Sequence, residues 1–179
     1  MTGRVNLRES LILEVASASP ARTERIGRRL GELARPGDVF CLRGPLGAGK
    51  TVLARGLARG LGVKGGIVSP SFTLIHEHST RSGLTLYHVD LYRLSPEAVA
   101  ELGLEECLER GGVMVIEWSE RLPAGLLGGR LEVELAFGSA PGRSPLRRAG
   151  ERERRLTFRP LGERALELLE AARIALAGD

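Results

Sequence analysis

The sequence predicts a three-layer α/β/α fold with a mostly parallel central sheet and an antiparallel pair of strands at its edge. Short apolar runs of strand length alternate with segments of helical periodicity, which is typical of parallel strands joined by helices. The most continuous apolar run, residues 113–116, suits a central strand that is buried on both faces. With 179 residues, the chain is expected to form one domain over 1–179, with a core of about 10–160 and a terminal helix of about 161–177.

The first part of the chain is expected to hold two strand–helix units. Residues 11–15 predict a strand, and Ser19 followed by a proline then predicts the start of a helix. This helix is expected to end at the Pro-Gly pair at residues 36–37. Residues 38–43 predict a short apolar strand, followed by a helix over 51–61 with leucines on one face.

The remainder is expected to contribute further strands and a helical region. In chain order these are a loop and strand over residues 69–78, strands over 84–90 and 113–116 separated by a helical region over 96–108, and an antiparallel pair over 131–136 and 155–158. Between the last two strands, residues 139–154 are rich in Gly, Pro and Arg, so a loop is expected there.

A glycine-rich stretch, Gly-Pro-Leu-Gly-Ala-Gly-Lys-Thr at residues 44–51, lies between the second strand and its helix. It matches the P-loop pattern, in which backbone N–H groups surround phosphate oxygens. The residues expected to supply this backbone are Gly44, Leu46, Gly47, Ala48 and Gly49. Lys50 is expected to contact the β- and γ-phosphates, and the Thr51 hydroxyl is expected to bind Mg²⁺. Strand, loop and helix together predict a P-loop NTPase fold.

Two acidic residues follow apolar strands. Glu117 comes directly after residues 113–116, and Asp90 closes the strand over 84–90. A P-loop site needs an acid near its metal ion, usually at the carboxyl end of a neighbouring buried strand. We expect both acids to face the γ-phosphate, one helping to hold the water shell of the metal and the other positioning the attacking water. Which acid has which task stays open.

The amino-acid composition restricts which nucleotide the chain is expected to bind and in which cellular compartment it is expected. The single asparagine is Asn6 and there is no glutamine, so neither a guanine-reading N-K-x-D motif nor a water-orienting Gln is available. ATP is therefore the expected nucleotide. No apolar run approaches the length needed to span a membrane, and a cytoplasmic protein that does not bind membranes is expected.

The three histidines leave an alternative open. His76 and His78 would share one strand face, and His88 precedes Asp90 by two residues. Such a group could form a transition-metal site, although exposed strand histidines explain the first two equally simply. Ser69 and Ser71 flank a proline, and their hydroxyls could sense the γ-phosphate or the metal.

The ordered motifs closely resemble the TsaE family, small bacterial P-loop ATPases required for making N6-threonylcarbamoyladenosine in tRNA. The resemblance covers roughly residues 10–136. Its four blocks are Leu-Gly-Ala-Gly-Lys-Thr at 46–51, Ser-Pro-Ser-Phe-Thr-Leu at 69–74, His-Val-Asp-Leu-Tyr-Arg-Leu at 88–94 and Ile-Glu-Trp-Ser-Glu at 116–120.

This resemblance implies roles for individual residues. Lys50 and Thr51 would bind phosphate and Mg²⁺, Glu117 would be a further metal-site residue, and Asp90 would be important for hydrolysis. Residues 69–72, with Ser71 as a ligand, would form a nucleotide-responsive switch, and Trp118 would lie near the nucleotide. The chain departs from the family at two positions, with Pro45 in place of the usual Asp and Ser71 in place of the usual Thr.

The resemblance also implies an ATP-driven accessory protein rather than the transferase itself. It would dock on the TsaB–TsaD pair, have a weak intrinsic ATPase, and meet tRNA only indirectly. Two other functions remain open on the residues alone: a small-molecule kinase that uses the same P-loop, and an RNA-binding module with ATP as a structural ligand. The oligomeric state is not predicted.

Overall fold

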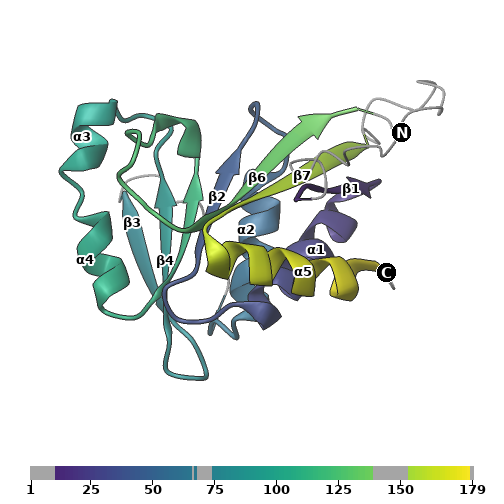
Figure 1. Ribbon diagram of the computed structural model, residues 1–179, viewed down its shortest axis with the longest axis horizontal. Helices are drawn as coiled ribbons and strands as arrows, with labels where there is room; N and C mark the ends of the chain where they lie inside the picture. Colours follow the sequence, from purple (N-terminus) through teal and green to yellow (C-terminus); the bar gives the residue numbers. More distant parts are fainter. Residues whose placement is uncertain (1–10, 66, 68–73, 139–152, 178–179) are drawn as a thin grey trace, which may run out of the picture.

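The computed structural model describes residues 11–65, 67, 74–138 and 153–177 (Figure 1). Among these residues, seven strands form one sheet in the order β1-β7-β6-β2-β5-β4-β3. The strands are β1 (Leu13–Ser17), β2 (Val39–Arg43), β3 (Ile75–Ser79), β4 (Thr85–Asp90), β5 (Val113–Glu117), β6 (Arg130–Phe137) and β7 (Arg154–Leu161). The same residues form the helices α1 (Pro20–Leu33), α2 (Lys50–Gly60), α3 (Pro96–Ala100), α4 (Leu104–Glu109) and α5 (Glu163–Ala177), and a 3₁₀ helix, η1 (Ser119–Arg121).

The centre of the sheet is parallel and both of its edges are antiparallel. β6, β2, β5 and β4 run parallel to one another, whereas β7 and β1 extend one edge and β3 the other in antiparallel pairing. This confirms the predicted fold class, and the predicted antiparallel pair is β6 with β7. The pair is not outermost, because β1 lies beyond β7.

Helices cover both faces of the sheet. α1, α2 and α5 share the core of one face, and α3 and α4 share the core of the other (Figure 1). β2 is buried on both sides, since Phe40 and Leu42 face the first group of helices whereas Val39 and Cys41 face the second. This double burial accounts for the continuous apolar run in β2. The strand order places the carboxyl end of β2, where residues 44–49 begin, in the middle of the sheet.

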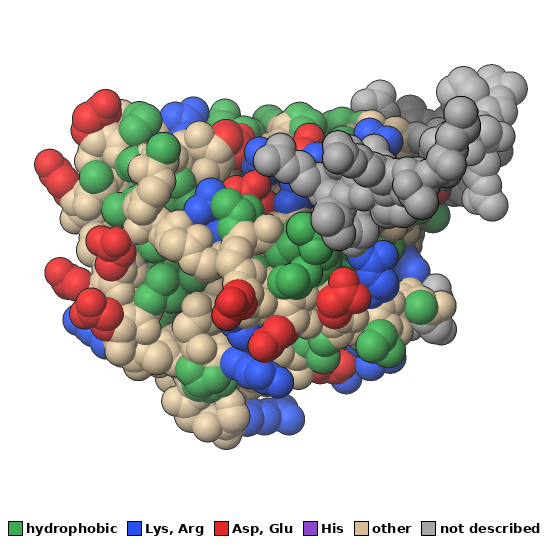
Figure 2. Space-filling model, viewed as in Figure 1, with side chains coloured by type: hydrophobic (Ala, Val, Ile, Leu, Met, Phe, Trp, Pro, Cys, Tyr) green, Lys and Arg blue, Asp and Glu red, His purple; other side chains and the backbone are tan. Residues whose placement is uncertain are grey.

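The helical region predicted over residues 96–108 is two short helices. The Ser95 hydroxyl accepts a hydrogen bond from the Ala98 N–H at 3.3 Å and caps α3. Gly103, at φ +67°, then separates α3 from α4, in a conformation that favours glycine. Exposed glutamates cover both helices, and Figure 2 shows acidic side chains gathered on this side of the molecule: Glu97, Glu101, Glu105, Glu106 and Glu109.

Glycines line the contact between α1 and α2. A Cβ atom added to any of four glycines would lie 2.1–2.3 Å from a backbone oxygen of the facing helix: Gly27 and Gly31 in α1, and Gly56 and Gly60 in α2. No real Cβ atom approaches an oxygen so closely, so the two helices pack at this distance only because these positions lack side chains. Because α2 begins at the end of the glycine-rich loop, this packing also holds the loop against the sheet.

Replacing Gly27 by alanine is expected to lower the free energy of unfolding by about 1–3 kcal/mol, as in other overpacked cores. The added methyl group would lie 2.3 Å from the Leu53 carbonyl oxygen, and a helix-propensity gain of about 1 kcal/mol offsets only part of that cost. Guanidinium unfolding measures the change. The control is Gly128→Ala, where a Cβ atom meets nothing within 4 Å. Equal unfolding midpoints for the two variants would contradict this account of the helix contact.

No helix in the described part of the chain is both long and apolar enough to cross a membrane.

Candidate functional site

The candidate site lies at the carboxyl ends of the parallel strands, the usual place for ligands in open α/β sheets. Residues 44–49 connect β2 to α2 at this edge. Asp90 and Glu117 end β4 and β5 and are directly paired in the parallel register, and Leu42 of β2 pairs with Glu117 on the other side. The topology therefore brings both predicted acids beside the predicted P-loop.

The loop depends on backbone that only glycine adopts easily. Gly44 has φ +138°, and a Cβ atom there would lie 2.1 Å from the Leu135 carbonyl of β6. Gly49, at φ +106°, occupies the N-cap position of α2 and has no side chain with which to cap it. The first-turn N–H groups of α2 therefore receive no cap from this position, and a helix N-terminus of this kind binds anions. Leu46 is 74% exposed, so its contribution to such a site would come from its backbone.

Lys50 is held by the carbonyl groups of its own loop. Its Nζ donates to the oxygens of Gly44 at 2.6 Å and Pro45 at 3.0 Å, and the residue is only 5% exposed. Burial lowers the pKa of the Lys50 ammonium, and neighbouring carboxylates act in the opposite direction (Glu120, Glu117 and Asp90). The cation thus sits at the mouth of the loop, where phosphate oxygens would be stronger acceptors than the carbonyls.

Glu117 is the centre of a buried hydrogen-bonded chain. The Thr51 hydroxyl donates to Glu117 Oε2 at 2.8 Å, and His88 Nε2 lies 2.9 Å from Glu117 Oε1. Glu117 is 2% exposed and His88 is fully buried. An ionised carboxylate only accepts hydrogen bonds, so the His88 proton belongs on Nε2. With one oxygen held by His88, Glu117 presents the other to Thr51 at the start of α2.

Asp90 lies next to Glu117 but makes a different set of contacts. Its Oδ1 accepts the Tyr92 N–H at 3.0 Å, which orients the carboxylate at the strand end. Burial raises the pKa of Asp90; the Tyr92 hydrogen bond opposes this shift, and the nearby charge of Glu117 adds to it. Among the described residues, Glu117 is therefore hydrogen-bonded directly to the P-loop, through Thr51, and Asp90 is not.

An aromatic wall covers the loop on the side of the acids. The Trp118 ring centroid lies 3.7 Å from Lys50 Nζ, and the Tyr92 ring packs against Trp118 with centroids 4.7 Å apart. Trp118 has φ +60°, the left-handed conformation, which other non-glycine residues of the described chain do not adopt. Such backbone strain is found where a side chain must be aimed, here over the lysine cation.

The donor set fits a small, hard cation. Thr51 offers a hydroxyl oxygen and Glu117 a carboxylate oxygen, 2.8 Å apart, and Mg²⁺ is typically bound through one or two such protein oxygens plus phosphates and waters. No group of three or more His, Cys, Asp or Glu in the described chain could hold a metal by itself. Instead of joining such a group, His88 bonds Glu117, and His76 and His78 lie with ring centroids 6.1 Å apart.

Comparison with known proteins decides the family. The protein-family model described as "Threonylcarbamoyl adenosine biosynthesis protein TsaE" matches residues 17–144 of the chain. The chain belongs to the TsaE family. It is 37% identical over 158 residues to the Bacillus subtilis protein named tRNA threonylcarbamoyladenosine biosynthesis protein TsaE, a match covering 88% of this chain and 92% of that relative. It is 48% identical over 110 residues to the protein of the same name from Nostoc sp., covering 59% and 67%.

A solved structure agrees with this membership. The crystal structure of Bacillus subtilis YdiB matches with a TM-score of 0.69 at 34% identity, and the match covers 92% of this chain and 95% of that one. The TsaE family membership and the α/β fold are thus supported by independent comparisons.

In this TsaE family chain, most of the predicted site residues come together. Lys50, Thr51, Glu117 and Trp118 are linked by direct contacts, and Asp90 is the strand neighbour of Glu117. The predicted switch, residues 69–72, including Ser71, lies outside the described residues, as does most of the predicted arginine-rich loop. The hydrogen bond between His88 and Glu117 was not predicted from the sequence. Strand alternation was the available signal, because it puts His88 and Asp90 on one face of β4.

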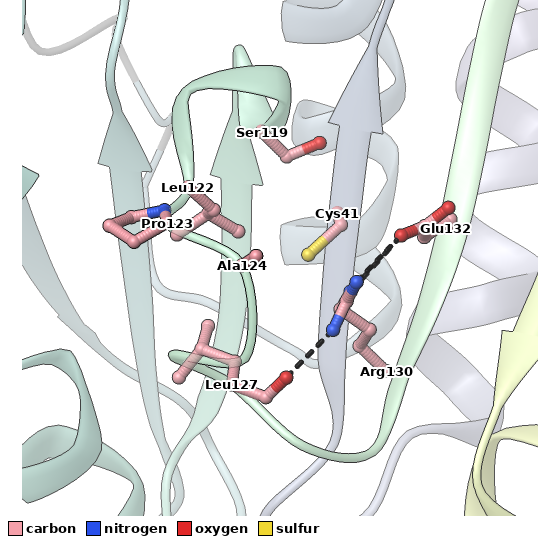
Figure 3. A pocket seen from close by; sticks show the side chains of 8 residues that line it. All are labelled: Cys41, Ser119, Leu122, Pro123, Ala124, Leu127, Arg130 and Glu132. Atoms are coloured by element: carbon pink, nitrogen blue, oxygen red, sulfur yellow. Dashed lines mark hydrogen bonds and ion pairs between the residues drawn. The ribbon is translucent and has the colours of Figure 1, made fainter. Parts of the chain in front are cut away.

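A small cavity lies on the opposite face of the sheet, between β2, η1 and the start of β6 (Figure 3). Its volume is about 70 Å³, and the Cys41 thiol points into it. Arg130 closes one side by donating to Glu132 at 2.9 Å and to the Leu127 carbonyl at 2.7 Å. Burial raises the pKa of Cys41 to about 12, so the thiol is protonated and unreactive at neutral pH. This cavity is too small for a metabolite and is separate from the loop.

Proposed function

We propose that this chain binds and hydrolyses ATP with Mg²⁺ as an accessory protein in the formation of N6-threonylcarbamoyladenosine in tRNA. One observation carries the chemical part: Thr51, at the end of the P-loop, bonds Glu117 across 66 residues of sequence. This contact joins the phosphate-binding loop to a buried acid, as an NTPase requires. The biosynthetic part rests on the family and on the names of its relatives.

The ammonium of Lys50 and the N–H groups of the loop would hold the β- and γ-phosphates. Lys50 donates to the Gly44 and Pro45 carbonyls in the free protein, and phosphate oxygens would replace these acceptors. Thr51 and Glu117 would hold Mg²⁺, which when bound neutralises charge on the phosphate oxygens. The His88 hydrogen bond would keep Glu117 in the orientation that this requires.

Asp90 would position the attacking water. It lies beside Glu117 at the strand end, and burial raises its pKa, which favours proton acceptance nearer to neutral pH. Glu117 already has a hydrogen bond to each of its carboxylate oxygens, which leaves Asp90 as the acid better able to accept a further donor. We therefore propose that Glu117 helps to hold the metal ion and that Asp90 positions the attacking water.

The partner of the ATPase is proposed to be the TsaB–TsaD pair, with tRNA met only through that complex. Partner-supplied groups raise P-loop hydrolysis by about 10³–10⁵-fold in known cases, so turnover should be slow alone and rise clearly with the pair. Phosphate release from ATP, measured with and without purified TsaB–TsaD, tests this. If no hydrolysis occurs under either condition, the proposed ATPase activity is contradicted. If the turnover rate does not change when TsaB–TsaD is added, the proposed partner is contradicted.

A small-molecule kinase is the alternative that uses the same loop. It would need a pocket beside the loop that binds the acceptor metabolite. Labelled γ-phosphate that appeared on a metabolite instead of in inorganic phosphate would favour the kinase.

An RNA-binding module was the other alternative. The acidic surface of α3 and α4 argues against nucleic-acid binding on that side of the molecule, because its carboxylates would repel the phosphates of RNA.

A further inference from the structure

The two helices that pack through glycines carry arginines on their outer side. α1 and α2 lie on one face of the sheet, with their buried residues in its core and the others at the surface (Figure 1). The exposed arginines of the two helices are Arg25, Arg28, Arg29, Arg55 and Arg59. Residues three or four apart share one side of a helix, so the guanidinium groups of each helix form a stripe. Arg59 of α2 pairs with Glu24 of α1, which shows that the two stripes lie side by side.

The acids on this surface do not balance its arginines. Glu32 accepts hydrogen bonds from two arginines of α1, at 2.9 and 3.1 Å, and Glu24 pairs with Arg59. Arg25 and Arg55 have no acidic partner in the described part of the chain. Five arginines against two glutamates leave a net charge of +3 on the outer side of the two helices.

The arginines are not spread evenly over the molecule. Residues 96–109, which contain α3 and α4, include five glutamates and not one lysine or arginine. These helices cover the opposite face of the sheet (Figure 1). A general preference of the chain for arginine would have placed arginines on both faces. The charges are instead segregated, so the field of the molecule attracts anions to the side of α1 and α2 and repels them from the other side.

The kind of partner follows from the side chains that this surface lacks. The energetic centre of a protein interface is formed by large apolar, aromatic or arginine side chains in packed pockets, and a membrane-binding helix needs an apolar face. The exposed large hydrophobic residues of the described chain all lie outside α1 and α2: Leu11, Leu46, Leu74, Tyr92, Phe137 and Ile174. Guanidinium groups without apolar neighbours suit an array of phosphates, because each stays charged and offers paired N–H donors to phosphate oxygens.

We propose that the outer side of α1 and α2 binds the phosphates of RNA, so that the chain itself contacts tRNA. This adds a direct contact to the proposed function, in which tRNA is met through TsaB–TsaD. Such binding depends on the release of counterions from the phosphates and is independent of sequence, with a Kd of about 10⁻⁴–10⁻⁶ M at physiological salt. The glycine contact between the helices holds the two stripes at a fixed separation, and α2 begins at Lys50. RNA on this surface would therefore lie along the helix that starts at the P-loop.

The test is the salt dependence with which the full chain binds a tRNA transcript. Fluorescence anisotropy gives the affinity between about 50 and 200 mM salt, the range over which phosphate contacts weaken strongly. Arg25→Gln and Arg55→Gln each remove a guanidinium that has no acidic partner, so neither leaves a carboxylate unpaired. Each is expected to weaken tRNA binding by about 3- to 10-fold at the lower salt concentration and to reduce the salt slope by about 1.

Arg110→Gln is the matched control. Arg110 is exposed at the end of α4, so this variant loses the same charge from the opposite face of the sheet. It is expected to bind tRNA as the unmodified chain does. Thermal unfolding of all three variants shows that each is folded.

Two results would overturn the inference. One is an unmodified chain without salt-dependent affinity for tRNA, or one whose affinity falls equally in all three variants. The other is that Arg25→Gln and Arg55→Gln bind tRNA normally but lose affinity for purified TsaB–TsaD, which would mean that the surface binds an acidic protein instead. The tRNA titration contains no ATP, so either result leaves the proposed ATP hydrolysis intact, and a chain that binds tRNA but does not hydrolyse ATP would overturn only that activity.

Discussion

Replacing Lys50 by alanine is expected to lower ATP turnover by about 10²–10³-fold, the usual effect of removing one preorganised charged donor from an active site. The ammonium is nearly buried, is held at the loop mouth by the Gly44 and Pro45 carbonyls, and is covered by the Trp118 ring. It is therefore already positioned where the phosphates would bind, and alanine leaves nothing to replace its charge. Phosphate release at saturating ATP measures the loss.

Lys64→Ala is the matched control for this variant. Lys64 is the other lysine of the chain and is exposed, so its removal changes the net charge equally without touching the loop. Its turnover should equal that of the unmodified chain. Turnover that Lys50→Ala leaves unchanged, in a variant whose thermal unfolding is normal, would end the ATPase proposal.

The two acids are expected to fail in different ways when their charge is removed. Glu117→Gln should weaken the affinity for Mg²⁺ in the nucleotide complex by roughly 10- to 100-fold, because the amide is a poorer partner for the metal and for His88. Asp90→Asn should lower turnover by about 10²–10⁴-fold with Mg²⁺–ADP affinity nearly unchanged, because the amide cannot accept the proton of the attacking water. Asparagine still accepts the Tyr92 N–H, so the strand end is preserved.

Trp118 supplies the readout that separates these two variants. It is the single tryptophan of the chain, and its ring lies over Lys50, so its fluorescence should change when phosphate displaces the lysine from its carbonyl partners. Titrating ADP at several Mg²⁺ concentrations gives the metal dependence without any turnover. If Asp90→Asn lost the Mg²⁺ dependence and Glu117→Gln kept it, the assignment of the two acids would have to be exchanged.

The local parts of the site were predictable from the sequence because their chemistry is contained in a short stretch. Gly44, Gly49, Lys50 and Thr51 lie in one motif, and the strand before it and the helix after it are strong signals. Glu117 was predictable for a similar reason, since it directly follows a run that is apolar throughout and fully buried in β5. The α/β class followed from the same alternation of strands and helices.

What the sequence could not supply is the set of contacts between distant segments. The bond from His88 to Glu117 depends on β4 lying beside β5, and strand order is not written in either strand. The antiparallel pairing of β6 with β7 was predicted, but its register, which places Phe137 opposite Arg154, was not. The position of β1 outside β7 belongs to the same class, because a short strand with alternating burial suits several edges of a sheet.

The split of the 96–108 region has a different origin. Its residues favour a helix on either side of Gly103, and Gly103 adopts a left-handed conformation that a continuous helix does not permit. An isolated glycine is tolerated inside many helices, so the sequence alone did not indicate a break there. The break lets Val99 of α3 and Leu104 of α4 both pack into the same core.

The most direct test of the central claim is a crystal structure of the chain with Mg²⁺ and a non-hydrolysable ATP analogue. We expect a polyphosphate within residues 44–51, with Lys50 Nζ turned from its loop carbonyls to the phosphates. We also expect a metal ion held by the Thr51 hydroxyl and by Glu117, either directly or through water. A nucleotide bound elsewhere, or a metal ion out of reach of Glu117, would contradict the claim.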